Sequence, residues 1–335
     1  MTSIVISGSG LFTPKETVTN EELVKAFNQY VDLFNEQNKA AIDAGEIQAM
    51  SYSSCEFIEK ASGIKSRHVM YKEGILDPNV MQPIFHKRLA GETPEMVEMA
   101  AIAAKEALAQ AGRTADEVDL IICGASNFQR AYPSMAVELQ ALLGADGYGY
   151  DMNVACSSAT FGIINASNAI KAGNAKIALI VNPEFASPQI NYKSRDSHFI
   201  FGDVCTATVV EAEEGCNATN AFKILGTKQK TSFSNNIRCD VGYTDHCFDD
   251  LSADNPYFSQ EGRKVFKELL PIVSNVILSH LDEMQLPQNE LKRLWLHQAN
   301  IHMNIYAAKK VLNKADVPDH QAPLVLDDYA NTASA

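Results

Sequence analysis

Two hydrophobic periods alternate along the chain, and together they predict strands that are followed by helices. Short, nearly continuous apolar runs are typical of strands covered on both faces. Longer runs with apolar residues three and four positions apart are typical of helices. The expected strands lie at 3–12, 118–126, 149–155, 176–182 and 203–213, and the expected helices at 93–112, 133–144 and 157–173. This alternation indicates an α/β fold in which helices cover a sheet.

The helix at 93–112 has the clearest start and stop signals. Thr93 precedes it, Pro94 takes the expected first helical position, and Gly112 follows the last apolar residue. Proline is favoured in the first turn and glycine just past the last turn, because of their backbone preferences.

The strand–loop–helix pattern occurs a second time near the end of the chain. The stretch EVDLIICGASN, which starts at Glu117, aligns with ELKRLWLHQAN, which starts at Glu290, at an offset of 290 − 117 = 173. At the nearby offset of 331 − 156 = 175, Cys156 falls on Asn331. Two copies indicate a duplicated βα unit rather than a solenoid. The repeat therefore predicts a second strand that ends just before His297.

Two segments interrupt this regularity. The segment at 28–54 is partly amphipathic, and we expect a helical insertion there, either a lid near the site or a plain solvated helix. The second interruption lies at 71–90. The duplication divides the chain into an N-terminal half at 1–214 and a C-terminal half at 215–335.

Composition narrows the classes of function. The chain has 335 residues and is 46% apolar, enough for a large core, and its net charge of −13 argues against a nucleic-acid partner. No signal peptide and no apolar run of about 20 residues is present, so we expect no membrane partner. The seven cysteines include no CxxC pair, which favours a reduced, cytoplasmic protein over a disulfide or zinc scaffold.

Cys156 is the first candidate for chemistry. It lies among small residues in NVACSSA, between an expected strand and an expected helix. A buried structural role is the commoner one for a cysteine, and we expect it for the other six. Strand ends of α/β sheets bind ligands, however, and a helix N-terminus favours a thiolate. We therefore expect a lowered pKa for Cys156, and a site in which it meets His297 and Asn331.

Several motifs in the right order carry a resemblance to a known family. VACSSA, LHQAN and YANTASA, together with SGIKSRH, AYPS and FGD, resemble the β-ketoacyl-acyl-carrier-protein synthase III family of the thiolase-like superfamily. The resemblance covers nearly the whole chain. It implies a five-layered αβαβα arrangement of two βα halves, with Cys156 as nucleophile and His297 and Asn331 as its catalytic partners.

The reaction implied by the resemblance is a decarboxylative Claisen condensation that starts fatty acid or related synthesis. An acyl group passes from a coenzyme A thioester to Cys156, malonyl-acyl carrier protein loses carbon dioxide, and the resulting carbanion attacks the acyl-enzyme. Covalent capture splits a difficult step into two, and His297 and Asn331 donate hydrogen bonds to the developing enolate oxygen. Acyl-coenzyme A is a substrate here, and we expect no metal or redox cofactor.

The sequence departs from the family pattern in the expected coenzyme A site. Phe57 and Ala61 stand where a tryptophan and an arginine often clamp the adenine, so we expect an aromatic platform without a cation. His302 stands where an arginine often follows HQAN. Lys309 and Lys310 remain nearby as substrate-binding candidates.

Two further features bear on partners. Arg263, with Lys264 and Lys267, forms a basic helical face, which is either a solvated surface or a contact for the carrier protein or nucleotide. Tyr132, in AYPS, stands where the family reaches across a homodimer interface into the partner's acyl pocket. The resemblance thus implies a homodimer.

Two other function classes stay open. The order of cysteine, histidine and asparagine also suits a papain-like thiol hydrolase, although the duplicated βα pattern argues against it. A non-catalytic or acyl-transfer-only homologue is the other class, because the chain ends four residues after Asn331 whereas the first copy continues to Glu214. On this symmetry argument we expect the chain to be a fragment of a longer protein.

Overall fold

A six-stranded mixed sheet forms the centre of the computed structural model, which describes residues 2–85, 88–89, 91–242, 245 and 257–335. The strand order is β5-β4-β6-β7-β1-β8; β4 runs parallel to β5 and β6, and the pairs β6–β7, β7–β1 and β1–β8 are antiparallel. The strands are β1 (Ile4–Phe12), β4 (Leu120–Gly124), β5 (Tyr148–Met152), β6 (Ile177–Glu184), β7 (Val204–Ala212) and β8 (Phe222–Lys223). All but the short β8 were predicted from the sequence.

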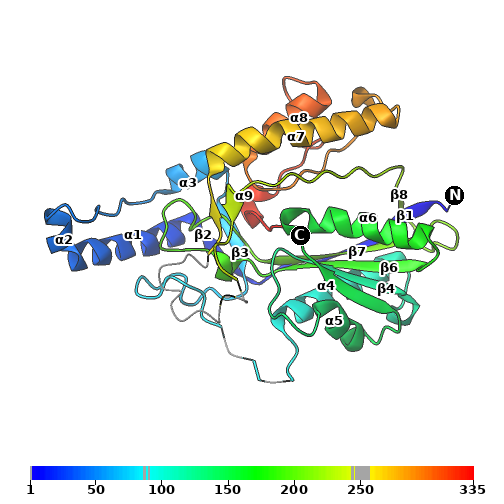
Figure 1. The fold of residues 1–335 in the computed structure, drawn as a ribbon, viewed down its shortest axis with the longest axis horizontal. Helices are drawn as coiled ribbons and strands as arrows, with labels where there is room; N and C mark the ends of the chain where they lie inside the picture. The colour runs from blue at the N-terminus through cyan, green and yellow to red at the C-terminus, as the bar shows by residue number, and fades with distance from the viewer. Residues whose placement is uncertain (1, 86–87, 90, 243–244, 246–256) are drawn as a thin grey trace.

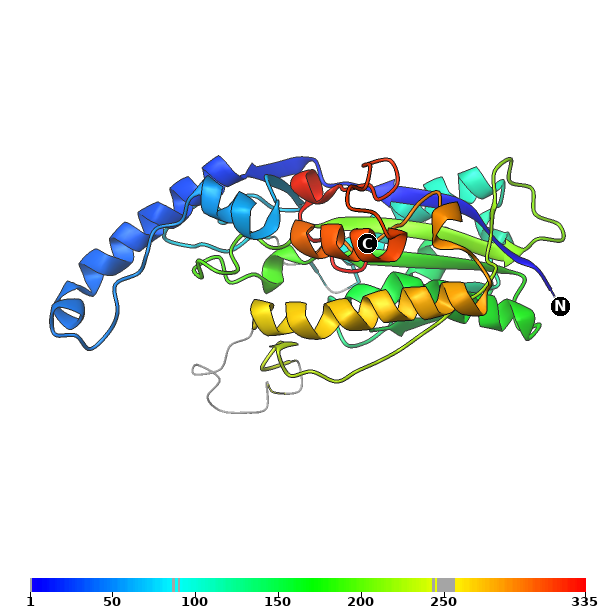
Figure 2. The same cartoon turned by 90° about the horizontal axis from the view of Figure 1, so that it is seen from above.

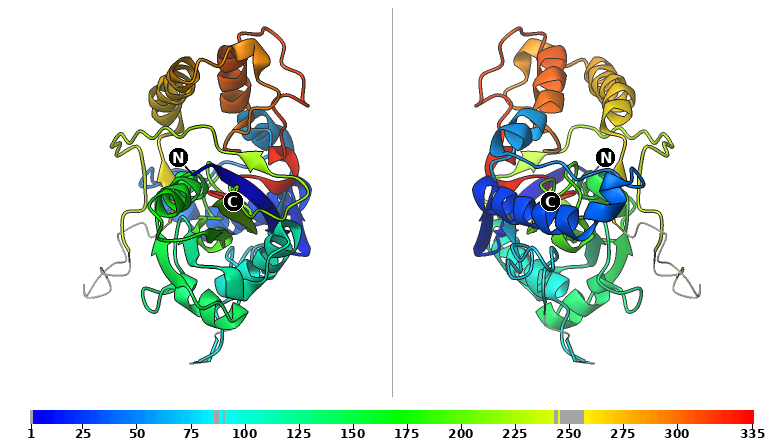
Figure 3. Two further views of the ribbon diagram at one scale, coloured as in Figure 1. Left: turned by 90° about the vertical axis from the view of Figure 1, so that its right-hand side faces the viewer. Right: turned by 90° about the vertical axis from the view of Figure 1, so that its left-hand side faces the viewer.

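Helices cover both faces of this sheet, as the apolar strands require. Helices α4 (Glu95–Ala111) and α5 (Met135–Leu143) pack on one face and α6 (Ser158–Lys171) on the other (Figures 1 and 3). The α/β class and the three predicted helices are confirmed. Helix α4 begins one residue later than expected, because Pro94 adopts an extended backbone and forms its N-cap.

Helix α4 packs unusually close to β1. A β-carbon on Gly8 would lie 2.1 Å from the carbonyl oxygen of Ala107, and one on Gly10 would lie 2.0 Å from that of Ala103. Only glycine allows this contact, since any side chain would overlap the helix backbone. The SGSG stretch is therefore a packing feature of the core.

The C-terminal half consists mainly of helices, and here one sequence prediction is wrong. Helices α7 (Gly262–Glu283), α8 (Ile301–Leu312) and α9 (Leu326–Tyr329) form, with α7 and α8 beyond α6 in Figures 1 and 3. The strand expected before His297 is not formed at 291–297. A strand needs the ladder of a neighbour, and the Leu294 N–H instead donates to the Gln321 carbonyl oxygen at 2.8 Å.

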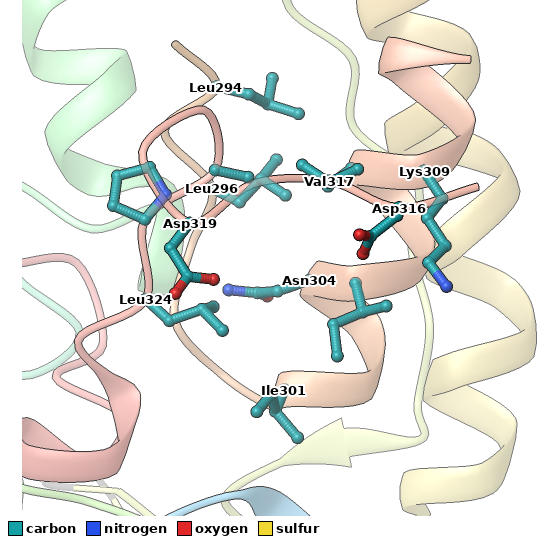
Figure 4. Close-up of a pocket in the computed structure, with 13 residues that line it drawn as sticks. Leu294, Leu296, Ile301, Asn304, Lys309, Asp316, Val317, Asp319 and Leu324 are labelled. Carbon is teal, nitrogen blue, oxygen red and sulfur yellow. The ribbon is translucent and has the colours of Figure 1, made fainter. Parts of the chain in front are cut away.

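A cavity of about 370 Å³ lies beside this irregular segment. Leu294 and Leu296, alternate residues of the expected strand, line it together with side chains from α8 (Figure 4). The alternating apolar side chains of Leu294 and Leu296 are thus on one side, as predicted, but that side faces a cavity instead of a sheet.

The insertion predicted at 28–54 is partly helical. It comprises the distal part of α1 (Asn20–Gln37), helix α2 (Lys39–Asp43) and a returning irregular segment that leads to α3 (Cys55–Ser62); α1 and α2 project from the body (Figures 1 and 2). The segment at 71–90 contains no helix or strand in its described residues. No helix among the described residues is both long enough and apolar enough to cross a membrane.

Paired side-chain hydrogen bonds hold the returning segment to α1. The Asn28 amide bonds both to the N–H of Ser53, at 2.8 Å, and to its carbonyl, at 3.1 Å. The Asn35 amide bonds in the same way to the N–H of Met50, at 2.8 Å, and to its carbonyl, at 3.1 Å. Along α1, the seven residues from Asn28 to Asn35 rise about 10.5 Å, and along the returning segment the three residues from Met50 to Ser53 span about 10 Å. The spacing of the two amides therefore matches the spacing of the two backbone sites.

Two short antiparallel pairs complete the fold. Strand β2 (Glu16–Thr19) pairs with β3 (Ser66–Val69) beside α9, and β9 (Ile237–Arg238) pairs with β10 (Ser259–Gln260) before α7.

Candidate active site

Cys156 lies in a tight turn between β5 and α6, as the sequence predicted. Residues Ala155–Ser157 form a single 3₁₀ turn, and Ala155 has a φ of +47°. A positive φ is unfavourable for alanine, so neighbouring groups must hold the turn. The Asn153 carboxamide oxygen accepts the Ala155 N–H at 2.9 Å, and the Ser158 hydroxyl donates to the Ala155 carbonyl at 2.8 Å. The half-buried Cys156 thiol thus stands on a firmly fixed backbone.

Asn331 follows helix α9 and forms an isolated β-bridge with Phe201, so the strand-to-helix turn that the repeat predicted here is wrong. Ala330, which precedes it, also has a positive φ, +57°. The Asn331 N–H donates to the Ile200 carbonyl at 3.0 Å, and its carbonyl accepts the Gly202 N–H at 3.1 Å. Its side-chain oxygen accepts the Ala333 N–H at 2.9 Å. The amide nitrogen makes no hydrogen bond within the described residues and remains available as a donor.

The buried carboxyl group of Glu184, at the end of β6, contacts the loops next to both turns. It accepts the Ser126 N–H at 2.9 Å and the Ser126 hydroxyl at 2.6 Å. It also accepts the Ser334 N–H at 3.1 Å and the Ser334 hydroxyl. Burial raises the pKa of Glu184 to about 7, although these four hydrogen bonds act in the opposite direction. Sequence analysis missed Glu184, because nothing in the strand pattern marks its partners.

The expected lowering of the Cys156 pKa is wrong. Burial, and to a smaller extent the nearby Glu184 carboxylate, raises the pKa of this thiol to about 11. The helix N-terminus that follows does not outweigh the loss of water around the sulfur. Cys156 is therefore a protonated thiol at neutral pH.

His297 lies in a loop whose next residues, Gln298 and Asn300, are hydrogen-bonded to two other segments of the chain. The Gln298 amide donates to the Pro323 carbonyl at 3.4 Å, and the Asn300 amide donates to the Ala61 carbonyl at 2.8 Å, on α3 of the other half. Solvent reaches the His297 ring, but surrounding protein excludes enough water to lower its pKa to about 4. The ring is therefore a neutral imidazole at neutral pH. It makes no hydrogen bond to Cys156, Asn331 or any other described residue.

Phe57 carries a cation on its ring, contrary to expectation. The Arg195 guanidinium carbon lies 3.7 Å from the centre of the Phe57 ring, and Phe199 meets that ring edge-on at 6.0 Å. The Arg195 Nε donates to the Tyr52 carbonyl at 2.8 Å, which fixes the side chain. The cation absent at position 61 is thus supplied by a loop that lies far away in the sequence.

The remaining predicted substrate-binding residues lie at the surface. Tyr132 is 87% exposed, Arg263 is exposed on α7, and Lys309 is exposed at the rim of the cavity in Figure 4. No interaction among the described residues joins any of the three to the Cys156 turn. The His302 ring nitrogen Nε2 lies 3.0 Å from the Lys60 carbonyl oxygen, which can accept its N–H.

The other cysteines make no disulfide among the described residues. Cys123 and Cys205 are buried in the sheet, Cys55 and Cys216 are half-buried, and Cys239 is exposed. Cys247 lies outside the described residues. No group of three histidine, cysteine, aspartate or glutamate side chains among the described residues could hold a metal ion.

Comparisons with known proteins agree on one family. The family described as 3-oxoacyl-[acyl-carrier-protein] synthase III matches residues 150–232. The β-ketodecanoyl-[acyl-carrier-protein] synthase of Pseudomonas aeruginosa is 50% identical over 313 residues, which cover 93% of this chain and 89% of that protein. The β-ketoacyl-[acyl-carrier-protein] synthase III of Bordetella petrii is 29% identical over 339 residues, covering 100% and 87%.

Solved structures give the same result for the fold. The crystal structure of 3-oxoacyl-[acyl-carrier-protein] synthase III from Aquifex aeolicus superimposes with a TM-score of 0.74 and 26% identity, and covers 99% of this chain and 87% of that one. The thiolase-like class predicted from the sequence is therefore confirmed.

We expect the alkylation of Cys156 by iodoacetamide to accelerate about tenfold per pH unit from about pH 7 to about pH 10, because only the thiolate reacts. The raised pKa, about 11, means that the thiolate fraction is still rising throughout this range. Mass spectrometry of the peptide that contains Cys156 measures the rate, with Cys156→Ser as the blank. A plateau below pH 9, the ordinary value for a cysteine thiol, would contradict the buried environment.

Proposed function

The chain belongs to the β-ketoacyl-acyl-carrier-protein synthase III family, and from this premise we propose that Cys156 accepts an acyl group from coenzyme A and passes it to malonyl-acyl carrier protein. The family relationship makes the protein a condensing acyltransferase of fatty acid synthesis and sets aside the papain-like hydrolase. The observation that supports Cys156 is its placement on a strained, tightly held turn at a strand end.

In the first step, the Cys156 sulfur attacks the thioester carbonyl carbon, and the bond to the coenzyme A sulfur breaks. The thiol proton leaves with the released coenzyme A. Because burial keeps Cys156 protonated, the thiol reacts slowly until a bound thioester accepts the proton on its leaving sulfur. Covalent capture then stores the acyl group for the second step.

In the second step, malonyl thioester loses carbon dioxide, and its carbanion attacks the acyl carbonyl while the Cys156 sulfur leaves. Negative charge develops on the thioester oxygen of the malonyl group. The Asn331 amide nitrogen suits this charge, since Ala333 already occupies the side-chain oxygen and thereby orients the amide. A neutral His297 supplies one N–H donor.

The Phe57–Arg195 pair supports coenzyme A as the acyl donor. The Arg195 guanidinium, stacked on the Phe57 ring and fixed through Tyr52, presents a flat cationic surface and hydrogen-bond donors. These groups suit a purine and its phosphates. We propose this pair as the nucleotide site, in place of the pair Phe57 and Ala61.

The acyl chain is proposed to be of medium length. The Pseudomonas relative is named for β-ketodecanoyl synthesis, and condensation of an octanoyl primer with a malonyl unit gives that product.

Lys309 and Arg263 are proposed carrier-protein contacts, on the basis of charge and exposure alone. The division at 214/215 and a cytoplasmic location also remain predictions.

A homodimer is proposed through the β5 edge of the sheet. Among the described residues this strand pairs only with β4. Exposed apolar or aromatic side chains lie on β5, on the adjacent helix α5 and just before that helix: Tyr132, Val137, Leu142, Tyr148 and Tyr150. A second copy that pairs along β5 would cover both the free ladder and these side chains.

Cys156 acylation tests the proposed function directly. We expect octanoyl-coenzyme A to acylate the protein faster than acetyl-coenzyme A, because each buried methylene contributes about 0.8 kcal/mol. Intact mass measured over a ladder of acyl lengths reports the rate, and Cys156→Ala should take up no acyl group. Full transfer by Cys156→Ala would contradict the role of Cys156 as the acyl acceptor. Rates that fall steadily from acetyl to octanoyl would contradict the medium chain length.

His297→Ala and Asn331→Ala should each slow decarboxylation of malonyl-acyl carrier protein by roughly 10²–10³, the usual loss for one preorganised donor. Release of labelled carbon dioxide measures this step. Asn168→Ala, an exposed position on α6, is the matched control. Normal decarboxylation by both site variants would show that these residues do not stabilise the enolate.

Sedimentation of the full chain at micromolar concentration should give a dimer. Val137→Glu, in the proposed interface, should dissociate it, because a charge would be buried without a partner. Leu33→Glu, an exposed leucine on the α1 projection, should not. A monomeric parent protein would refute the dimer.

A further inference from the structure

We propose that Glu184 is a positioning residue that fixes the Cys156 turn and the Asn331 turn relative to each other. The inference rests on the proposed function, since it assigns both turns to one reaction. It concerns a residue to which neither the sequence motifs nor the resemblance gives a role. Glu184 is completely buried at the end of β6.

One branch of hydrogen bonds leads from Glu184 to the Cys156 turn. Ser126 is held twice by the carboxylate, through its N–H and its hydroxyl. The Ser126 carbonyl accepts the Asn153 amide N–H at 2.9 Å, and the oxygen of that amide accepts the Ala155 N–H at 2.9 Å. Ala155 is the residue with positive φ directly before Cys156. The carboxylate is thus connected to the strained point of this turn through two residues, the backbone of Ser126 and the side chain of Asn153.

The other branch leads to the Asn331 turn. Ser334 is also held twice by Glu184. Ala333, the preceding residue, has a φ of +52° and donates its N–H to the Asn331 side-chain oxygen. Fixing Ser334 therefore fixes the residue that orients the Asn331 amide.

A carboxylate suits this position better than any other side chain. Four donors converge on it, two N–H groups and two hydroxyls, and its ionised form, which prevails above its pKa of about 7, has four acceptor sites and no donor. A glutamine would present its NH₂ group to donors on one side and leave buried hydrogen bonds unmade. An aspartate would keep the charge but lacks the length to reach both serines.

No cation pairs with Glu184 among the described residues. The titratable groups near it are the thiols of Cys123, Cys156 and Cys205, all of whose pKa values are raised by burial and, to a smaller extent, by its charge. A buried unpaired carboxylate is costly for the fold. Its retention at this point fits a role in positioning the two turns rather than in stability.

The test compares Glu184→Asp and Glu184→Gln with Asp119→Asn. Asp119 accepts the N–H groups of Lys176 and Ile177 at the opposite end of the β4–β6 pair. It is therefore a control for the loss of a carboxylate that bridges the same strands. For each variant we would measure thermal unfolding, acylation by octanoyl-coenzyme A, malonyl decarboxylation, and the pH dependence of Cys156 alkylation.

We expect Glu184→Asp to lose roughly 10²-fold in the turnover number for condensation, as misplacement by about 1 Å does in other active sites. Its KM for acyl-coenzyme A and its alkylation profile should stay unchanged, because the charge remains. Glu184→Gln should lose turnover and also move the alkylation curve to lower pH. Asp119→Asn should change only the unfolding temperature.

Two serine variants separate the branches if the glutamate variants fail to fold. Ser334→Ala should slow decarboxylation and spare alkylation, whereas Ser126→Ala should slow acylation. Full turnover in Glu184→Asp, or identical effects of Glu184→Gln and Asp119→Asn, would overturn the proposal. If the parent protein does not condense at all, the proposed function fails, while the shift of the alkylation curve still decides whether Glu184 acts on Cys156.

Discussion

Complete burial of the two central strands β4 and β6 is the constraint on which the rest of this structure depends. Strand β6 is buried along all eight residues, including Asn182 and Glu184, and α4 lies so close to β1 that two positions admit only glycine. With both faces closed, the polar groups of the sheet can meet a substrate only where the strands end. The turn of Cys156, the carboxyl group of Glu184 and the turn of Asn331 all lie at this end. The location of the chemistry therefore follows from the packing.

Burial also sets the electrostatic character of the site. Exclusion of water keeps Cys156 as a thiol, and a lowered pKa keeps His297 a neutral imidazole. A thiolate at Cys156, as found in thiol hydrolases, would place a charge in a poorly hydrated space. A neutral thiol avoids that cost and reacts only slowly with small electrophiles at neutral pH. On the proposed function, reactivity comes with the thioester, which brings a leaving group able to carry the proton away.

The N-terminal half could be predicted from the sequence because its signals are local. Apolar runs gave the strands, and Thr93, Pro94 and Gly112 marked the limits of α4 to within one residue. The turn of Cys156 could be placed because it joins a predicted strand to a predicted helix. In the C-terminal half, the alternation of Leu294 and Leu296 was equally clear, yet no strand formed. Alternation shows which side chains avoid water, but only a neighbouring strand can complete the ladder.

The site properties that sequence analysis missed are all non-local. Arg195 reaches Phe57 across 195 − 57 = 138 residues, and Glu184 reaches Ser334 across 150. The helix N-terminus after Cys156 is a local feature and argued for a lowered pKa, whereas the desolvation that prevails comes from the whole fold. A motif can therefore nominate candidate catalytic residues, since their spacing is recorded in the chain. The groups that hold those residues in place, and the water that they lose, are determined only when distant segments pack together.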